Sequence, residues 1–530
     1  MTKKAVIAVL VFNLFIAASF FIMNYGVGYS RLSSDQHNIV PMCQKLDDPA
    51  LFKNDLYLSS VDNFKYYTPF FVQPLRFMAK LTNGDYMLAI NILHTATHIL
   101  YGLSWFVLFY FVFKRNFWIA FLLSILIRGI VWLPGMEIWG MSDLWTFVPR
   151  QLYSALLPIP FIILLAKSSY RYRLFFSAFL IGLIFNFHPI TGLGGILIYL
   201  FTLFFIGLKS NSILKLSFIR VLSSVVFIIL GMLPFIITYF GKTETTATYN
   251  VELYQKAFDA RIPSYFKDVV KYASQWIHIK TLFFLVPTAI LFALSLFYKS
   301  LKKQSFFVLT LGAVLFIVPL LSIPIENWVN SAFNINLRMS FQIVRVQKLA
   351  ILPGYLAMGF LLVWCMERKF ISKKLLAGLT ALYIFLIILA TPNRFKPIPF
   401  ISDDITTSIY CNGPVFASIE EKQRDFDKMA AYIKKETPVN AVFYKEYRLR
   451  SAALRSVKFD HKGASILIEG NPEELIEWYK AKRKLRKASE LEKEFFLNEH
   501  DVTHILSEEN FESYQMIKQI GMLKLYAIKN

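Results

Sequence analysis

Long apolar runs, each followed by a short polar stretch, recur along the chain as far as about residue 392. A helix needs about 20 apolar residues to cross a hydrocarbon layer about 30 Å thick, because each residue advances it by about 1.5 Å. The pattern therefore predicts about eleven transmembrane helices. They lie at roughly 5–27, 86–113, 117–135, 151–166, 174–188, 190–208, 218–240, 281–298, 305–324, 349–366 and 375–391.

Lys and Arg gather in every second connection between these runs. Together with the N-terminal segment and the adjoining ends of the runs, those connections hold 17 basic residues and one acidic residue, Glu367. Short cytoplasmic loops are the ones that carry an excess of Lys and Arg. The alternation predicts a cytoplasmic N-terminus, and it places a long first loop at 28–85, together with the chain after the eleventh run, outside the cytoplasm.

The composition agrees with a membrane protein. Of the 530 residues, 56% are hydrophobic and 17% are charged, with 3 Cys and a formal net charge of +22. Soluble domains have about 45–50% apolar and about 25% charged residues, so an ordinary soluble protein, a disordered chain and a disulfide scaffold are all excluded. Residues 1–392 hold 34 Lys and Arg against 14 Asp and Glu, whereas 393–530 hold 23 against 21. The positive charge thus marks topology, and no nucleic-acid partner is expected.

The last part of the chain has a different pattern. We divide the chain into a multi-span domain, 1–392, and a tail, 393–530, joined by the proline-containing linker "TPNRFKPIPFISDD". Helical and strand patterns alternate in the tail, which predicts a small α/β domain outside the cytoplasm. The expected order is a helix at 420–436, strands at 441–444 and 456–460, a charged helix at 471–497, a strand at 503–506, a short helix and a strand at 524–528.

Residues 29–70 of the first outer loop contain five aspartates, of which Asp35 and Asp55 are the stronger candidates for a function. A carboxylate at a membrane surface can act as a general base for an acceptor hydroxyl or amine, or can bind a divalent cation. The alternative is that outer loops simply tolerate acids, and we favour that explanation for Asp47, Asp48 and Asp62.

The second outer loop, "PGMEIWGMSDLWTFVPRQL", places Glu137, Asp143 and Arg150 among tryptophans. Tryptophans anchor helices at the membrane interface, which explains them without a function. The two carboxylates and Arg150 can instead face a cleft that also contains Asp35.

Several cations lie where the topology rule does not expect them. Arg128 falls within the third run, where a charge costs about 2.5–3.5 kcal/mol on insertion scales, so it should face protein or a hydrated cavity. Arg338, Arg345 and Lys348 precede the tenth run on the outer side. Either they bind a lipid-linked phosphate, or they extend to lipid head groups. His188, at the outer end of the fifth run, can contact the same phosphate.

Other residues have ordinary explanations. His94 and His98 share one face of the second run, but two ligands do not make a metal site, and we expect hydrogen-bonded core histidines. Cys43 and Cys411 are both predicted outside the cytoplasm, and whether they pair stays open. The chain has no P-loop, dinucleotide fingerprint, zinc spacing or nucleophile elbow, so no nucleotide cofactor is expected.

The layout resembles the GT-C superfamily of membrane glycosyltransferases, in its many spans, its long first outer loop with an early Asp, its acids in the second outer loop and its outer C-terminal α/β domain. The tail segment "TPVNAVFYKEYRLRSAALRSVKFDHKGASILIEGNPEELIEWYKAKRKL" is similar to the end of an uncharacterised group of bacterial GT-C-like proteins with an Arg-rich stretch, an "FD.K" element and a later "EW". The matching tail residues are Arg448, Arg450, Arg455, Asp460 and Lys462.

The resemblance implies transfer of a hexose or pentose from a polyprenyl phosphate to a glycan, lipid or protein acceptor at the outer face of a bacterial cytoplasmic membrane. Asp35 then takes the place of the catalytic first-loop Asp, although Gln36 follows it where several families have a second acid. Asp143 or Glu137 matches an acid that in some members helps bind a divalent cation, such as Mg²⁺ or Mn²⁺. Arg345, with Lys348 and Arg338, matches the phosphate-binding position.

Two other functions remain open at this point. A transporter or flippase of lipid-linked glycans would need Arg128 in a hydrated path, and such proteins often have inverted repeats, of which the sequence shows none. A GT-C-like scaffold without catalysis is favoured by the missing second acid after Asp35.

Overall fold

The computed structural model describes residues 3–129, 131–132, 138–139, 144, 146–166, 170–209, 214–240, 249–262, 268–333, 339–389 and 421–528. The chain packs into two compact units, and each is described by itself. Unit 1 consists of Met1–Met23, His94–Phe240 and Ser264–Ala417, and unit 2 consists of Asn24–Leu93, Gly241–Pro263 and Ser418–Asn530.

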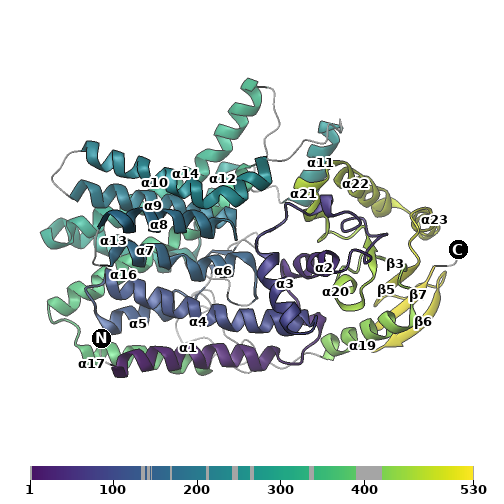
Figure 1. Ribbon diagram of the computed structural model, residues 1–530, viewed down its shortest axis with the longest axis horizontal. Coiled ribbons are helices and arrows are strands. Elements are labelled where there is room, and N and C mark those ends of the chain that lie inside the picture. Colours follow the sequence, from purple (N-terminus) through teal and green to yellow (C-terminus); the bar gives the residue numbers. More distant parts are fainter. Residues whose placement is uncertain are drawn as a thin grey trace. The chain divides into compact units, whose positions relative to one another are not determined.

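Unit 1 is helical apart from one short hairpin, and its long helices run roughly parallel in Figure 1. Its elements are α1 (Lys3–Asn24), α4 (Tyr86–Val112, whose first turns belong to unit 2), α5 (Phe117–Leu126), β1 (Val131–Trp132), β2 (Ile138–Trp139), α6 (Pro149–Leu156), α7 (Pro158–Leu165), α8 (Tyr170–Phe185), α9 (Pro189–Lys209), α10 (Leu214–Phe240), α12 (Val269–Ser274), α13 (Ile279–Phe297), α14 (Lys299–Phe333), α15 (Ser340–Ile343), the 3₁₀ helix η4 (Val344–Ile351), α16 (Leu352–Glu367) and α17 (Lys373–Leu389).

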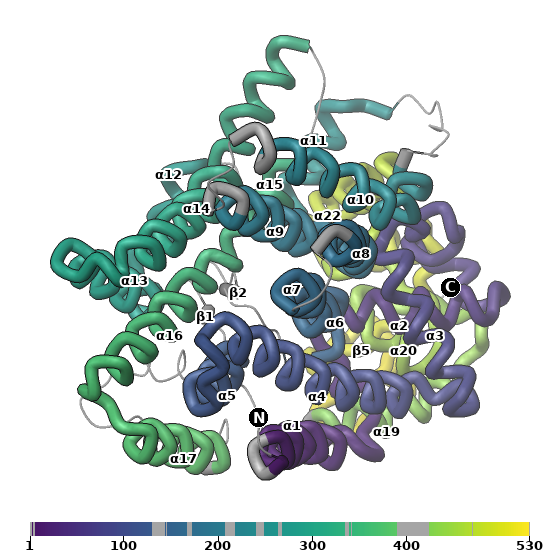
Figure 2. Tube along the Cα trace, turned by 60° about the vertical axis from the view of Figure 1, so that its left-hand side comes forward, coloured from purple at the N-terminus to yellow at the C-terminus, as the bar shows by residue number. Residues whose placement is uncertain are grey.

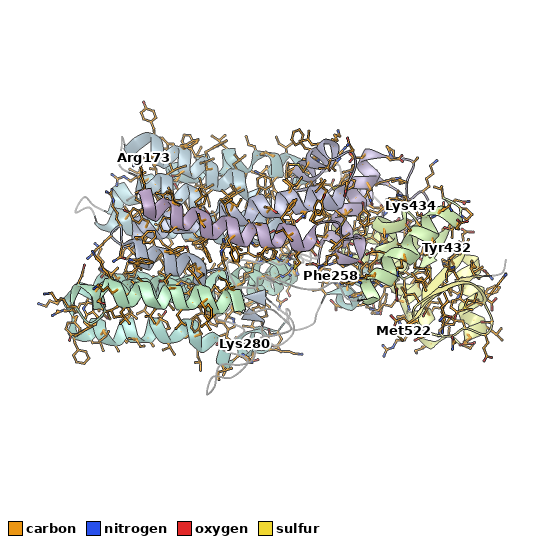
Figure 3. All side chains as sticks on the ribbon, turned by 90° about the horizontal axis from the view of Figure 1, so that it is seen from below. Arg173, Phe258, Lys280, Tyr432, Lys434 and Met522 are labelled. Carbon is orange, nitrogen blue, oxygen red and sulfur yellow. The ribbon has the colours of Figure 1, made fainter. Side chains whose placement is uncertain are left out.

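Within the described residues, seven helices are long and apolar enough to cross a membrane, and three further apolar helical segments are shorter. The seven are Val6–Asn24, Tyr86–Val112, Pro189–Ile206, Phe218–Tyr239, Ile279–Phe297, Lys299–Phe333 and Val344–Glu367. Together with α17, which covers most of the eleventh predicted run, these helices place helix in every predicted run, and the apolar helices indicate a multi-pass membrane protein. Arg173, near the start of α8, and Lys280, near the start of α13, lie toward opposite ends of the unit 1 helices in Figure 3.

Two predicted spans are not single helices. The third, expected at 117–135, ends as α5 at Leu126, so Arg128 follows the helix instead of lying within it. The fourth, expected at 151–166, is divided into α6 and α7 before Pro158. Proline removes a backbone donor and clashes with the preceding turn, which explains the second break.

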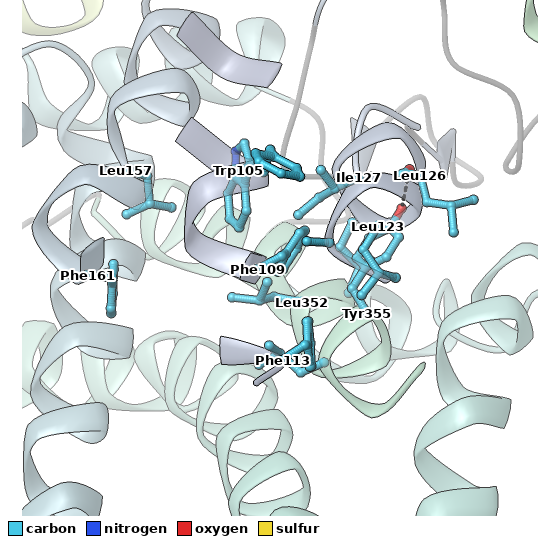
Figure 4. Close-up of a cluster of buried hydrophobic side chains, with 14 of the residues drawn as sticks. Trp105, Phe109, Phe113, Leu123, Leu126, Ile127, Leu157, Phe161, Leu352 and Tyr355 are labelled. Carbon is cyan, nitrogen blue, oxygen red and sulfur yellow. Dashed lines mark hydrogen bonds between the residues drawn. The ribbon is translucent and has the colours of Figure 1, made fainter. Parts of the chain in front are cut away.

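The core of unit 1 is built from aromatic and branched side chains, as the 52 Phe of the chain suggest. Trp105 and Phe109 of α4 lie opposite Leu157, between α6 and α7, and Phe161 of α7 in Figure 4. The hydroxyl of Tyr355 in α16 donates a hydrogen bond to the carbonyl of the last α5 residue at 3.1 Å. This bond satisfies one of the carbonyl groups that a helix C-terminus leaves unpaired.

Unit 2 is a mixed α/β body. Its elements are η1 (Tyr29–Arg31), α2 (Gln36–Asp47), η2 (Val61–Asn63), α3 (Val72–Leu81), α11 (Val251–Arg261), α19 (Glu421–Glu436), β3 (Val442–Tyr444), α20 (Arg448–Ala453), β4 (Ser456–Lys458), α21 (Ala464–Gly470), α22 (Pro472–Lys487), α23 (Glu490–Glu499), β5 (His504–Ser507), β6 (Gln515–Ile520) and β7 (Leu523–Ala527).

The five-stranded sheet of unit 2 has the order β4-β3-β5-β7-β6, with β3 parallel to β4 and β5 and the other pairs antiparallel. Alternate side chains of a strand point to opposite faces. Accordingly, Phe443 joins a core with α19 and α20, whereas Val442 joins a second core with α22 and α23. Both faces of the sheet are thus covered by helices.

The tail differs from its predicted pattern in three respects. The helices α20, between β3 and β4, and α21, between β4 and α22, were not predicted. The charged helix expected at 471–497 is two helices, because Ser489 begins a new one with a capping box in which Ser489 and Glu492 bond each other's backbone N–H. The short helix expected before the last strand is β6, an edge strand whose pairing with β7 ends at the turn that holds Met522. The helix α19 packs against β7, and the labelled Tyr432 of α19 marks this contact in Figure 3.

The first loop is the main difference from the predicted division at residue 392, which itself lies outside the described residues. The loop packs with the tail into unit 2 instead of with the spans. Arg450 explains this assembly. Its guanidinium is buried and pairs with Asp55 of the loop and with Asp460 of the tail, each at 2.6 Å.

We expect Arg450→Met to destabilise unit 2 by about 3–5 kcal/mol, because the substitution leaves two buried carboxylates without their cation. The measurement is hydrogen exchange of the β3 and β5 amides, together with thermal unfolding of the purified protein. Arg486→Met is the matched control, since Arg486 is exposed on α22, and exposed positions usually change stability by less than about 0.5 kcal/mol. Equal exchange rates in the two variants would contradict a central role for Arg450.

Candidate functional site

The main candidate group of unit 2 surrounds Asp35, at the N-terminus of α2. Asp35 precedes the first helical residue, but its side chain does not cap the helix. Its carboxylate instead accepts a hydrogen bond from Nζ of Lys462 at 3.1 Å, and the Asp35 and Lys462 side chains remain 29% and 23% exposed. A partly exposed carboxylate with an ammonium counter-ion can take a proton from a molecule that reaches it.

The segment that carries Lys462 is held against α2 by its own hydrogen bonds. The amide of Asn38 donates to the carbonyl of Lys462 at 3.2 Å and to Oγ of Ser465 at 3.0 Å. The backbone N–H of Gly463 donates to Asp460, which Arg450 holds in turn. The Asp35–Lys462 pair is therefore positioned by two anchored segments.

His37 also belongs to this group, although it was not among the predicted site residues. Its ring is buried and lies edge-on to Tyr447, with ring centroids 4.9 Å apart. The pKa of His37 is lowered to about 3, mainly by burial and then by the positive charges of Lys462 and Arg448, against the opposing effect of Asp35. The imidazole is consequently neutral near pH 7. In the sequence, the one feature that points to a role for His37 in this site is its position two residues after Asp35.

Asp55, a secondary candidate from the sequence, has a structural role instead. Its Oδ1 accepts from the backbone N–H groups of Tyr57 and Leu58, at 2.9 and 3.1 Å. Its Oδ2 accepts from Nε of Arg450 at 2.6 Å and from the backbone of Val457 at 2.7 Å. A carboxylate that is 2% exposed and accepts four protein hydrogen bonds is not available to a substrate.

The predicted phosphate ligands Arg345 and Lys348 lie in unit 1, on η4 just before α16. Lys348 is 9% exposed and Arg345 is partly exposed. Eight residues are a long 3₁₀ stretch, since runs beyond three or four are uncommon and often mark functional or strained segments. Gln347 anchors η4, because its amide donates to the carbonyl of Phe316 at 2.7 Å. The third member of the predicted set, Arg338, lies outside the described residues.

The N-terminus of α9 lies beside η4 because two glycines allow close packing. A Cβ on Gly194 would come within 2.3 Å of Leu349 in η4, and one on Gly195 within 1.8 Å of the Tyr153 hydroxyl in α6. α9 therefore adjoins two elements that carry predicted site residues: η4, with Arg345 and Lys348, and α6, with Arg150.

His188 precedes α9, and its Nδ1 accepts from the backbone N–H of Thr191 at 3.1 Å. This bond leaves Nε2 as the protonated nitrogen of a neutral ring. The positive end of the α9 dipole thus lies in the same part of unit 1 as the cations of η4 and α6, an arrangement that favours an anion.

Arg128, predicted to bind substrate, belongs to a different, internal network. It is 2% exposed, and Nη2 donates to Oδ1 of Asn13 at 2.5 Å and to the carbonyl of His98 at 3.1 Å. A Cβ on Gly102 would overlap Asn13 and lie 2.5 Å from Arg128, so this approach requires glycine. The guanidinium therefore ties the segment after α5 to α1 and α4.

The two histidines of α4 extend the Arg128 network, as the sequence predicts for core histidines. Nε2 of His98 lies 3.1 Å from Nε2 of His94, and Nε2 of His94 lies 3.0 Å from the carbonyl of Leu144. Among the residues that the structure describes, no group of three or more His, Cys, Asp or Glu is placed to hold a metal ion.

The two proposed metal ligands, Glu137 and Asp143, lie outside the described residues, as does Cys411. The divalent cation and the pairing of Cys43 therefore stay predictions. Cys43 itself is buried, and its Sγ lies 3.8 Å from the carbonyl of Val72.

The chain matches no family model and no curated protein. Its chemistry must therefore be inferred from two groups of residues, the Asp35–Lys462 pair with His37 in unit 2 and the cationic elements η4, α6 and α9 in unit 1.

The low pKa of His37 predicts that unit 2 loses stability in acid. In the unfolded chain the imidazole of His37 takes up a proton near pH 6.5, whereas in the folded chain it does so only near pH 3. The stability that unit 2 gains from the neutral His37 is therefore complete above about pH 6.5, and it is lost as the pH falls from there toward 3.

Melting temperatures at pH 7.5, 6 and 5 test this expectation in wild type, His37→Gln and His278→Gln. The His37 variant should show a smaller drop in melting temperature between pH 7.5 and 5. The control removes a partly exposed imidazole from unit 1, and it should keep the wild-type slope. Parallel slopes in all three proteins would refute the role given to His37.

Proposed function

We propose that the protein is a membrane glycosyltransferase that moves a sugar from a polyprenyl phosphate to an acceptor at the outer face of the membrane. The observation that supports this most directly is the partly exposed carboxylate of Asp35, paired with Lys462 at 3.1 Å. It is an early acid of the first loop, and it is the acid that the resemblance to GT-C enzymes selects.

In the proposed reaction the acceptor oxygen attacks the anomeric carbon while the bond from that carbon to the phosphate oxygen breaks. The acceptor proton passes to the Asp35 carboxylate, which serves as general base. The polyprenyl phosphate leaves as an anion, and Arg345 and Lys348 supply the positive charge that such a group needs. Lys462 keeps the Asp35 side chain in place between reactions.

The cationic elements of unit 1 support the phosphate part of this proposal. Arg345 and Lys348 on η4, and Arg150 on α6, belong to elements that pack against α9 at Gly194 and Gly195, and His188 directly precedes α9. Arg345 and Lys348 are on a 3₁₀ helix, in which hydrogen-bond geometry is poorer than in an α-helix. A divalent cation, such as Mg²⁺ or Mn²⁺, held by Asp143 or Glu137 belongs to the same proposal.

A scaffold without catalysis is the second candidate, and one observation favours it. The Asp35–Lys462 pair joins α2 to the segment after β4, so it also has a purely structural use. The transporter alternative receives less support, because it required Arg128 in a hydrated path, and Arg128 is buried among Asn13 and His98.

We expect Asp35→Asn to abolish transfer, by at least about 100-fold, because general-base catalysis contributes about 10²–10⁴-fold. The measurement is release of polyprenyl phosphate from a panel of labelled polyprenyl-phosphate hexoses and pentoses, with membrane extract as the source of acceptor. Asp62→Asn is the control, since Asp62 is exposed in the same loop and pairs only with the nearby Lys65 among the contacts described.

The two candidate functions give opposite results in this assay. Wild-type turnover in Asp35→Asn would exclude the general-base role. Absence of turnover in the wild type, with equal loss of unit 2 stability in Asp35→Asn and Lys462→Gln, would favour the scaffold.

We expect Arg345→Gln to raise KM for the lipid-phosphate donor about tenfold with a smaller change in kcat. The phosphate is bound before and during the reaction, and a hydrogen bond to a charged group contributes about 1.5–3 kcal/mol. Lys271→Gln, an exposed position on α12, is the matched control and should leave KM unchanged. An unchanged KM in Arg345→Gln would remove this residue from the donor site.

A further inference from the structure

A cavity of about 360 Å³ lies among five helices of unit 1, and ligand sites are commonly of about 300–1,000 Å³. Figure 2 shows these helices, α4, α7, α9, α14 and α16, as members of one bundle. Each contributes a segment of similar length to the wall: 105–112, 157–165, 198–206, 303–311 and 352–360. At about 1.5 Å per residue these segments describe a slot about 12 Å long that runs along the helices.

The two ends of the slot differ. At the deep end, Trp105, Leu157 and Leu311 are no more than 1% exposed, and Figure 4 shows Trp105 and Leu157 facing this space together with Leu352. At the other end, Leu165 is 39% exposed and Lys303 is exposed. The slot therefore opens at the Lys303 end of the bundle.

The polar lining is confined to three residues, of which two lie at the opening. Thr202 already donates its hydroxyl hydrogen to the carbonyl of Ile198 at 2.7 Å. Gln304, next to Lys303, has a buried Oε1 that finds no hydrogen-bond partner among the residues that the structure describes. The remaining wall is aliphatic and aromatic. The matching ligand has a long apolar part, an anionic group beside Lys303 and a hydroxyl that can donate to Gln304.

The charges around the opening indicate the source of this ligand. α14 begins with Lys299, Lys302 and Lys303, and α4 is followed by Lys114 and Arg115. These are residues that the alternation of basic connections assigns to the cytoplasmic side, where anionic lipids attract basic segments.

We propose that the slot binds one hydrocarbon chain of a phosphatidylglycerol-class lipid from this leaflet, with its phosphate on Lys303 and a head-group hydroxyl on Gln304. Lipid tails are as apolar as the bilayer, so insertion of the chain alone gives little selectivity. The head-group contacts select the lipid. This site is independent of the proposed transferase reaction.

Native mass spectrometry of the detergent-purified protein tests the proposal by titration with phosphatidylglycerol or with phosphatidylcholine of the same chains. We expect one tight phosphatidylglycerol per chain. Lys303→Gln should weaken its binding about fivefold, the typical effect of one basic residue near an anionic surface. Lys302→Gln is the matched control, because Lys302 is the exposed neighbour that does not line the slot.

A second pair of measurements locates the chain. Thr202→Phe places a ring in the slot and should reduce binding, while a normal melting temperature shows that the variant folds. Phosphatidylglycerol with brominated chains should quench tryptophan fluorescence in wild type, and less so in Trp105→Phe, because Trp105 lines the deep end.

Four outcomes would overturn the assignment. Equal binding of the two lipids, or equal effects of Lys302→Gln and Lys303→Gln, would exclude head-group selection by Lys303. Undiminished binding to Thr202→Phe would place the lipid elsewhere. Displacement of phosphatidylglycerol by an equimolar polyprenyl phosphate would assign the slot to that lipid instead.

Discussion

Unit 2 depends on one buried cation. Arg450 donates to Asp55, to Asp460 and to the carbonyl of Val457, while its guanidinium lies over the ring of Tyr57, 4.8 Å from the centroid. Burying three charges has a large desolvation cost, which is offset only when nearly every donor and acceptor is satisfied. Here the partners come from segments about 400 residues apart in sequence. The first loop therefore packs together with the tail, and the Asp35–Lys462 pair follows from that assembly, since Asp460 also fixes the segment of Lys462.

The helices of unit 1 depend on a different constraint, the close approach of backbones. Lipid provides no hydrophobic driving force between helices, so packing and internal hydrogen bonds must hold them. Small residues make this packing possible where polar groups need to meet. Because Gly102 has no side chain, Arg128 can reach Asn13. Because Gly194 and Gly195 have none, η4 and α6 can pack closely against α9. Close packing at glycine thus permits the buried Arg128 network in one place, and in another it brings η4 and α6, which carry candidate cations, against α9.

Much of the fold could be predicted from periodicity, because apolar runs and helix or strand patterns are local properties. The α19, β3, β4 and β5 segments lie within two residues of their expected starts. The sequence pattern did not predict the helix breaks at Leu126 and Ser489. A capping residue or a short helix end leaves only a weak signal within an otherwise continuous helical pattern. The membership of the first loop in unit 2 was also missed, because it rests on ion pairs between distant segments that no local pattern encodes.

The candidate cations illustrate the same limit. Arg128, Arg345 and Lys348 gave one signal in the sequence, a positive charge where the topology rule does not expect it. In the structure, Arg128 is enclosed by Asn13 and His98, whereas Arg345 and Lys348 stand on η4, an irregular helix beside the start of α9. An unexpected charge therefore identifies a residue that needs an explanation, and its surroundings decide which explanation applies. Enclosure by protein acceptors indicates a structural role for Arg128, whereas the position of Arg345 and Lys348 on η4, beside α9, is the observation on which the proposed phosphate site rests.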